Sequence, residues 1–340
     1  MPMLRWALLR TLWMVPTLIG ITFVTFLVMD LAPVDRAAME VAMSREADSV
    51  GLEPREVAVA RLRVRYGLVD PDTLEPVPMV QRYGRWLWNA VNLRFHGDGE
   101  DPREFRRRIA GALPVSILLG FWALVVAIGV GAPLGCWLGM RAGSRADRAA
   151  TSVMFALFGL PDVLLATLMI LWFGGPVFDW LPTAGLRSDG SERLSVFGQL
   201  LDLAGHLVLP VTVLAMGPTL LVVRFVRESV GRAAASTFAL NLEVWGIDPA
   251  TRRRRLLRAG LTPVATIAGA LLPMLVTGSI VVESVFSIEG LGRLSWNAVR
   301  GQDQSMVMAL TLIGSSATLV SLALSDLLHR WIDPRVQLAP

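Results

Sequence analysis

The sequence predicts an all-α membrane protein with six transmembrane helices, and three observations support this. Of the 340 residues, 54% are hydrophobic and 18% are charged, and the mean hydropathy is +0.54. This composition is typical of a chain that crosses a membrane several times. Six apolar stretches are long enough to cross, and the arginines of the short connecting loops gather on one side.

The apolar stretches set the order of the chain. A helix needs about 20 mainly apolar residues to cross a ~30 Å hydrocarbon layer. Stretches of that length lie near Leu12–Leu31, Leu113–Trp137, Ala149–Phe173, Leu207–Phe225, Pro263–Phe286 and Met306–Leu328. We interpret the first as a retained span, because its core is too long for a secretory signal and no small-residue cleavage site follows. The expected parts are a first transmembrane helix (1–32), an external segment (33–112), a five-helix core (113–328) and a tail (329–340).

Arginine placement predicts the orientation. Arginines flank the first stretch at Arg5 and Arg10 and cluster again in the segments 141–148, 227–258 and 330–335, all on one side. Short loops rich in Arg and Lys stay in the cytoplasm, so both termini are expected there. The opposing segment 33–112 also holds arginines, but it is longer than the roughly 60 residues over which this rule applies.

All 32 basic residues are arginine, so the chain has no lysine. A phosphate-binding loop of the GxxxxGK[ST] type needs a lysine on the terminal phosphates. If nucleotide powers this protein, a different chain must bind it.

The segment 227–262 stands out among the water-facing parts. Good helix formers run from Glu228 to Trp245, Gly246 interrupts them, and Asp248 before Pro249 is typical of a helix N-cap. A second, basic helix is then expected to run toward Pro263. Several apolar residues surround the glycine bend and cannot all be buried by so short a segment, so we expect a partner surface. They are Phe238, Leu242, Val244, Trp245 and Ile247.

Acidic residues are scarce in the predicted spans. Only Asp162, directly after Pro161, is placed at depth, and two interpretations stay open: it bonds to backbone groups that Pro161 leaves unpaired, or it lines a wet path. Glu283 is expected near the outer surface, accepting a hydrogen bond from Ser287 or from the Arg293 side chain.

Enzymatic and metal chemistry find no support in the sequence. No paired carboxylates share a span face, no HExxH or GxSxG motif occurs, and the three histidines are far apart. The single Cys136 is interpreted as a small buried hydrophobe. We therefore expect no enzymatic activity, no metal and no cofactor.

The C-terminal third resembles the permease subunits of bacterial dipeptide and oligopeptide ABC importers. The matching residues are Gly246 followed by the helix with Arg254 and Arg258 ending at Pro263, then Val282–Ser287, Gly290–Leu294, Asp326–Leu328 and Asp333–Arg335. Near the N-terminus Pro16–Leu18, Leu31–Pro33 and Tyr66–Leu68 resemble the same subunits, so the resemblance covers nearly the full length.

The resemblance implies the fold of a type I ABC importer transmembrane domain in a bacterial inner membrane. It further implies partners: a second homologous permease, two cytoplasmic ATP-binding subunits, an external solute-binding protein and membrane lipid, with no nucleic acid. The part that matches the family's coupling helix, which docks on an ATPase, is Asn241, Leu242, Glu243, Val244, Trp245, Gly246 and Ile247, with Arg254 and Arg258 beyond. Residues of the family pattern with an expected structural role are Pro263, Glu283, Gly290, Gly292, Arg293, Asp333 and Pro334.

One departure from the family pattern lies before the glycine. The family has small and basic residues there, whereas this chain has Asn241–Trp245. The docking chemistry is therefore expected to differ. Two alternatives stay open: a gradient-driven secondary transporter or channel, for which Asp162 is the only deep carboxylate, and a degenerate permease that acts as a membrane scaffold. The substrate, whether peptide, metal chelate, glutathione or sugar, also stays open.

Overall fold

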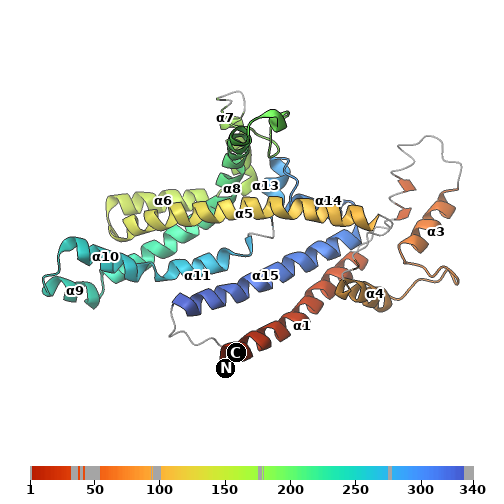
Figure 1. Ribbon diagram of the computed structural model, residues 1–340, viewed down its shortest axis with the longest axis horizontal. Coiled ribbons are helices and arrows are strands. Elements are labelled where there is room, and N and C mark those ends of the chain that lie inside the picture. The colour runs from red at the N-terminus through yellow and green to blue at the C-terminus, as the bar shows by residue number, and fades with distance from the viewer. Residues whose placement is uncertain are drawn as a thin grey trace. The chain divides into compact units, whose positions relative to one another are not determined.

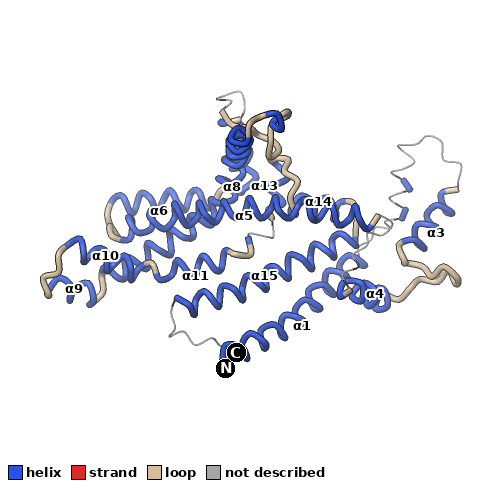
Figure 2. The backbone as a smooth tube through the Cα atoms, viewed as in Figure 1, coloured by secondary structure: helices blue, strands red, loops and turns tan. Residues whose placement is uncertain are grey.

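The computed structural model describes residues 2–31, 37–38, 41–42, 54–92, 94, 101–174, 178, 180–274 and 278–332. Within these ranges the regular elements are helices (Figures 1 and 2), and the one β-type pairing is an isolated antiparallel bridge between Val69 and Pro76. The all-α prediction is confirmed. Contacts divide the chain into two compact units, Met1–Gly111 with Leu294–Ser316, and Ala112–Arg293 with Ala317–Pro340.

Among the described residues, four helices are long and apolar enough to cross a membrane. They are Leu9–Asp30 within α1 (Pro2–Asp30), α5 (Pro102–Gly139), α8 (Val196–Ala234) and Gln304–Leu327 within α15 (Gln304–Ile332). The pair α6 (Arg145–Phe158) and α7 (Asp162–Phe173) makes a fifth span if taken together, bent by 100° at the break between them. The predicted stretch Pro263–Phe286 is instead divided between α11 (Thr262–Leu271) and α13 (Ile280–Val285).

The first unit contains α1, the short helices α3 (Arg55–Arg65) and α4 (Met79–Val91), and the beginning of α15. Its core joins three of these elements through Phe26, Tyr83 and Met308, all buried. The Tyr83 hydroxyl lies 3.0 Å from Thr22 Oγ1 and donates to the Ile19 carbonyl oxygen at 3.0 Å. These bonds attach α4 to α1.

The second unit is organised around α8. One cluster of buried side chains joins α8 to α5, α7 and α13, and its largest members are Leu119, Leu165, Leu209, Phe286 and Ile288. The second cluster joins α8 to α11 through Val222, Val226, Val230 and Ile267. Cys136 is half-buried and packs against this second cluster, in keeping with its interpretation as a hydrophobe.

A stripe of glycines lets α5 approach α8 closely. Gly131, Gly135 and Gly139 recur every four residues and so share one face of α5. A Cβ atom added at any of them would lie only 2.7–2.9 Å from a Cβ of Val222, Val226 or Val230. Real Cβ atoms do not approach so closely, so any larger residue would push the helices apart. Small residues at such positions are typical of helix pairs within a membrane.

The segment between α13 and α15 contains a further helix, α14 (Leu291–Arg300).

Candidate functional site

The segment 227–262 forms two short helices at the end of α8. The first residues of this segment remain helical, because α8 continues to Ala234. After a turn, α9 (Thr237–Val244) and α10 (Pro249–Gly260) follow, and Figure 1 shows both together beside that end of α8. Two helices and a glycine turn were expected here, but the first helix is divided at Ala235 and Ser236.

Gly246 ends α9 with a reversal of the backbone. Its φ is +66°, a left-handed conformation that side chains with a Cβ rarely adopt. The N–H of Gly246 donates to the Glu243 carbonyl at 2.9 Å, and the N–H of Ile247 donates to the Leu242 carbonyl at 3.2 Å. This pair of bonds is the Schellman arrangement, which satisfies the last carbonyl groups of a helix. The predicted bend at Gly246 is therefore present.

Asp248 caps the next helix. Its Oδ2 accepts a hydrogen bond from the backbone N–H of Thr251 at 2.9 Å, and Pro249 is the first helical residue. Both features were predicted. The hydrogen bond from the Thr251 N–H holds the pKa of the Asp248 carboxyl below its ordinary value.

Part of the apolar surface expected to need a partner is buried within the segment itself. Leu242 is 1% exposed and forms a small core with Ala239 and Leu256, against which Ile247 and Met140 also pack. Met140 directly follows α5, so this core connects the hairpin of α9 and α10 to the membrane-spanning part of the unit. The expectation that Leu242 faces a partner is wrong, because the hairpin already buries this side chain. Ile247 is half-buried, and its contact with a partner stays a prediction.

Four apolar residues in and directly after α9 stay exposed. Val244 and Trp245 are each 74% exposed, and Leu240 and Phe238 are also exposed. Asn241 is exposed as well. Beside them, Glu243 Oε2 forms an ion pair with Arg252 Nη1 at 2.8 Å, which ties α9 to α10. We call the set Leu240, Val244, Trp245 and the Glu243–Arg252 pair the docking face.

A groove of about 670 Å³ opens between the end of α8, α9 and α10. Its lining is mixed in character, with hydroxyl, carboxylate, guanidinium and small apolar groups. The polar lining residues are Ser236, Thr237, Glu243, Arg252 and Arg253. Arg254 and Arg258, also expected in this site, are exposed on α10.

The hairpin is held to α8 by another close approach. A Cβ atom added at Gly260, the last residue of α10, would lie 2.5 Å from Val230 Cγ2. Val230 is fully buried, and the same side chain lies against Gly139 of α5. One valine of α8 therefore contacts glycines on two other helices, and the sequence offers no signal of this arrangement beyond the glycine spacing.

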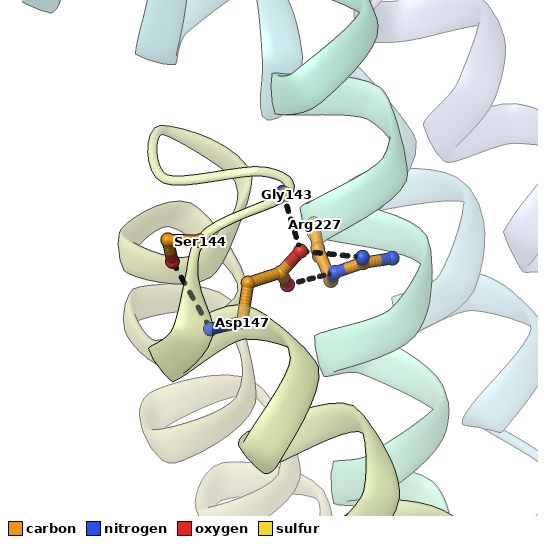
Figure 3. A network of polar contacts seen from close by, with 4 residues as sticks. All are labelled: Gly143, Ser144, Asp147 and Arg227. Atoms are coloured by element: carbon orange, nitrogen blue, oxygen red, sulfur yellow. Dashed lines mark hydrogen bonds and ion pairs between the residues drawn. The ribbon is translucent and has the colours of Figure 1, made fainter.

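Figure 3 shows a polar contact that fixes the turn between α5 and α6. Arg227 of α8 binds both carboxylate oxygens of Asp147, with Nη2 at 2.8 Å from Oδ2, and the N–H of Gly143 donates to the same Oδ2 at 2.8 Å. Ser144 caps α6 by accepting from the Asp147 N–H at 3.1 Å. Arg227 was expected to begin the water-facing segment, yet it serves to hold α6 against α8.

Glu283 is fully buried, and its hydrogen-bond donors are not the ones expected. Oε1 accepts from Ser116 Oγ at 2.8 Å, and Oε2 accepts from the backbone N–H of Arg293 at 2.8 Å. The N–H of Ser279 lies 3.3 Å from Oε1. Ser287 is exposed and donates nothing to this carboxylate. Glu283 therefore ties α13 to α5 and to the start of α14, through a serine that sequence reasoning missed.

Two glycines of the family pattern pack directly against the Glu283 carboxylate, where a larger residue would not fit. A Cβ atom at Gly290 would lie 2.5 Å from the Glu283 carboxyl carbon, and one at Gly292 would lie 3.0 Å from Oε2. Pro263 is the second residue of α11, and Asp333 and Pro334 lie outside the described residues. Glu283, the Ser116 hydroxyl and the backbone N–H of Arg293 thus form one polar cluster, with Gly290 and Gly292 packed against the carboxylate. This cluster is well separated along the chain from the docking face.

Asp162 lies at the bend between α6 and α7 rather than inside a straight span. It is the first residue of α7 and is exposed, and its carboxylate makes no hydrogen bond within the described part of the chain. Its role in a wet path stays a prediction. Among the described residues no three His, Cys, Asp or Glu side chains gather as a metal site would require.

The long apolar helices define the class of protein, an integral membrane protein that crosses the bilayer several times. Residues 131–338 match the model of the family described as binding-protein-dependent transport system inner membrane component, and the chain belongs to this family. The match includes the docking face and the Glu283 cluster. The chain is a multi-pass inner membrane protein of an ABC importer.

Several curated relatives are similar over nearly their whole length. The peptidoglycan transport system permease protein YejB of Agrobacterium fabrum is 28% identical, with 96% of each chain covered. The oligopeptide transport system permease protein AppB of Bacillus subtilis is 27% identical, covering 96% of this chain and 98% of the relative. The dipeptide transport system permease protein DppB of the same organism is 27% identical, with 99% of each covered.

Proposed function

We propose that this chain imports peptides or peptide-containing molecules as one permease of a larger ATP-driven assembly. The names of its relatives, which transport dipeptides, oligopeptides and peptidoglycan, support this substrate class. The assembly would contain a second homologous permease, two cytoplasmic ATP-binding subunits and an external solute-binding protein. This chain itself would hydrolyse no ATP.

The observation that carries the proposal is the docking face. Val244 and Trp245 are large, apolar and exposed at the tip of a hairpin that has its own core, its own caps and a close attachment to α8. Exposed apolar residues on an otherwise ordered element are typical of a protein contact. Trp is among the residues that contribute most to such contacts. We infer that an ATP-binding subunit covers this face.

The attachment of the hairpin explains how a movement there would reach the membrane. ATP binding would draw the two ATP-binding subunits together and displace the docking face. Because α10 packs on α8 through Gly260 and Val230, the hairpin and α8 would move as one body, as packed elements do in domain rearrangements. The spans would then open alternately to the two sides. Both termini would lie in the cytoplasm, as would the docking face.

A purification tests the assembly. The tagged chain is extracted from its native membrane in a mild detergent, and the proteins that accompany it are identified. We expect an ATP-binding subunit and a second permease. A chain that purifies alone, and that transports in vesicles under an ion gradient without ATP, would contradict the proposal in favour of a secondary transporter.

A pair of tryptophan variants tests the docking face. Trp245→Ala removes an exposed side chain from the face. It should weaken binding of the ATP-binding subunit by about thirtyfold or more, since a tryptophan at the centre of an interface contributes ~2 kcal/mol or more. Trp180→Ala is the matched control, because Trp180 is 68% exposed but lies in the connection between α7 and α8. Equal affinity of the two variants would remove the docking assignment. An unaltered ATPase rate in the presence of the permease would instead favour a non-transporting scaffold.

A further inference from the structure

A small pocket lies in the first unit, where α4 packs against the end of α1 and the start of α15. Its volume is about 180 Å³. Phe26 of its lining is near the end of α1, and Gln304 is the first residue of α15. Both helices are candidate membrane spans, so the pocket lies at a membrane surface whichever way the chain is oriented. Its polar lining residues are Tyr66, Arg82, Arg85, Asn89, Arg94, Gln304 and Ser305.

The lining is rich in groups that bind anions. Three arginines and no carboxylate are found among the described residues that line the pocket. Arg82 is positioned by neighbours outside the lining, because Nη2 pairs with Asp30 and Nε donates to the Val77 carbonyl oxygen at 3.2 Å. Arg85, in contrast, is exposed at the mouth. Guanidinium groups in such numbers favour a phosphate or a carboxylate.

A second observation points the same way. Gln304 Nε2 is buried, and none of the described residues accepts a hydrogen bond from it. A buried donor without an acceptor costs about 1–3 kcal/mol, so a bound water molecule or ion commonly supplies the missing partner. An anion in the pocket would supply the acceptor that Gln304 lacks.

The size of the pocket excludes a whole peptide. Pockets for small molecules usually measure about 300–1,000 Å³. A volume of about 180 Å³ corresponds to roughly six water molecules at ~30 Å³ each. That space suits a phosphate group and part of its ester, not a chain of amino acids.

The faces of α4 indicate where the rest of the ligand lies. Tyr83 and Ala90 are buried on one face, whereas Val80, Trp88 and Val91 are exposed and apolar. At 100° per residue the exposed apolar residues occupy one arc of about 80°, which lies beside the arc that carries the arginines. An amphipathic helix with this arrangement lies in the membrane interface, with tryptophan at headgroup level.

We propose that this pocket binds the phosphate of an anionic membrane lipid. Arg85 and the Gln304 amide donate to the phosphate oxygens, and the acyl chains lie along Val80, Trp88 and Val91. The bound lipid fixes α4 and the beginning of α15 at the membrane surface. This inference does not depend on the transport function, since it needs only that α1 and α15 cross the membrane.

The test measures lipid binding to the full chain, purified with whatever subunits accompany it. After delipidation, native mass spectrometry follows the binding of phosphatidylglycerol and of zwitterionic phosphatidylcholine. We expect one phosphatidylglycerol site of higher affinity. Arg85→Gln should weaken it about fivefold, which is the effect of one arginine near an anionic surface. Arg106→Gln, at an exposed arginine of the same unit outside the pocket, is the matched control and should change the affinity less than about twofold.

Gln304→Leu separates a specific site from general attraction, because it leaves the charge unchanged. This variant removes the donor and should weaken phosphatidylglycerol binding several-fold, while the lipid-free protein unfolds at an unchanged or higher temperature. Arg85→Lys keeps a cation and should retain most of the affinity.

Three outcomes would overturn the proposal. In the first, Arg106→Gln weakens binding as much as Arg85→Gln, which would indicate diffuse attraction. In the second, Gln304→Leu binds phosphatidylglycerol like the unaltered chain. In the third, a dipeptide or inorganic phosphate displaces the bound lipid, which would assign the pocket to a soluble anion.

Discussion

The close packing of α5 on α8 predicts opposite outcomes for the same substitution at two positions of one helix. Gly129 and Gly135 both lie inside α5. A Cβ atom at Gly129 meets nothing within 4 Å, whereas one at Gly135 would lie 2.7 Å from Val226 Cβ and 2.9 Å from the Val223 carbonyl oxygen. Replacement by alanine gains helix propensity of about 0.8–1.0 kcal/mol at either position. Only at Gly135 does it also force two helices apart.

The difference between the two variants isolates the packing effect. Overpacking of a well-packed site costs about 1–3 kcal/mol. Because the propensity gain is common to both, Gly135→Ala should weaken the contact of α5 with α8 by about 1–3 kcal/mol relative to Gly129→Ala. Relaxation of the Val226 side chain cannot remove the whole cost, since the Val223 carbonyl oxygen belongs to the backbone.

Cys136 offers a local probe of this contact. It is the single cysteine, it neighbours Gly135, and it packs half-buried against the valines of α8. The rate at which a membrane-permeable maleimide labels it in native membranes reports how often α5 separates from α8. A cost of about 1–3 kcal/mol corresponds to labelling about 5- to 150-fold faster in Gly135→Ala than in Gly129→Ala. Equal labelling rates in the two variants would refute the assignment of a tight glycine contact.

Three further predictions concern the docking hairpin and the buried cluster. Gly246→Val should abolish uptake while the protein still inserts, because a left-handed backbone costs a residue with a Cβ about 1–2 kcal/mol, and more when the side chain is branched. Gly246→Asn should retain uptake. Normal uptake by the valine variant would contradict this prediction. Glu283→Gln should lower the free energy of unfolding by about 1–3 kcal/mol, because either orientation of the new amide turns its N–H toward the backbone N–H of Ser279 or of Arg293. An unchanged midpoint of thermal unfolding in detergent would argue against the observed bonds. The pKa of Asp248 is lower in the folded chain, so its cap stabilises α10 fully above the ordinary Asp value near 4 and loses this effect as the pH falls through the folded value. Asp248→Asn should keep the cap at all pH values. The measurement is hydrogen exchange at the start of α10 as the pH is lowered. An equal response to acid in the unaltered chain and in Asp248→Asn would count against this prediction.

The elements that the sequence predicted well are those with a local signal. Apolar length marked the spans, and the Asp248–Pro249 pair marked the start of α10, because capping depends on residues adjacent in the chain. The turn at Gly246 was predictable for the same reason. The cap and the turn are each decided within about one helical turn, and a span is decided by the composition of one continuous stretch of about 20 residues.

The features that could not be predicted depend on contacts between distant residues. Ser116 gives no local sign that it will donate to Glu283, 167 positions later in the chain. Leu242 was expected on the partner surface because an apolar residue in a short helix does not reveal which neighbour covers it. The break in the stretch Pro263–Phe286 was also missed, since its hydropathy alone is that of an unbroken span.

Val230 of α8 contacts Gly139 of α5 and Gly260 of α10, and these two contacts bear on how α8 would move. With 39 residues at about 1.5 Å each, this helix is about 58 Å long. If it turned as one rod about its midpoint by only ~5°, each end would be displaced by about 2.5 Å, in opposite directions. The residues that face Val230 from α5 and α10 are both glycines, so neither has a flexible side chain that could absorb such a displacement. In such a rod, a displacement of the hairpin end would appear at the far end of α8 with equal size and opposite direction.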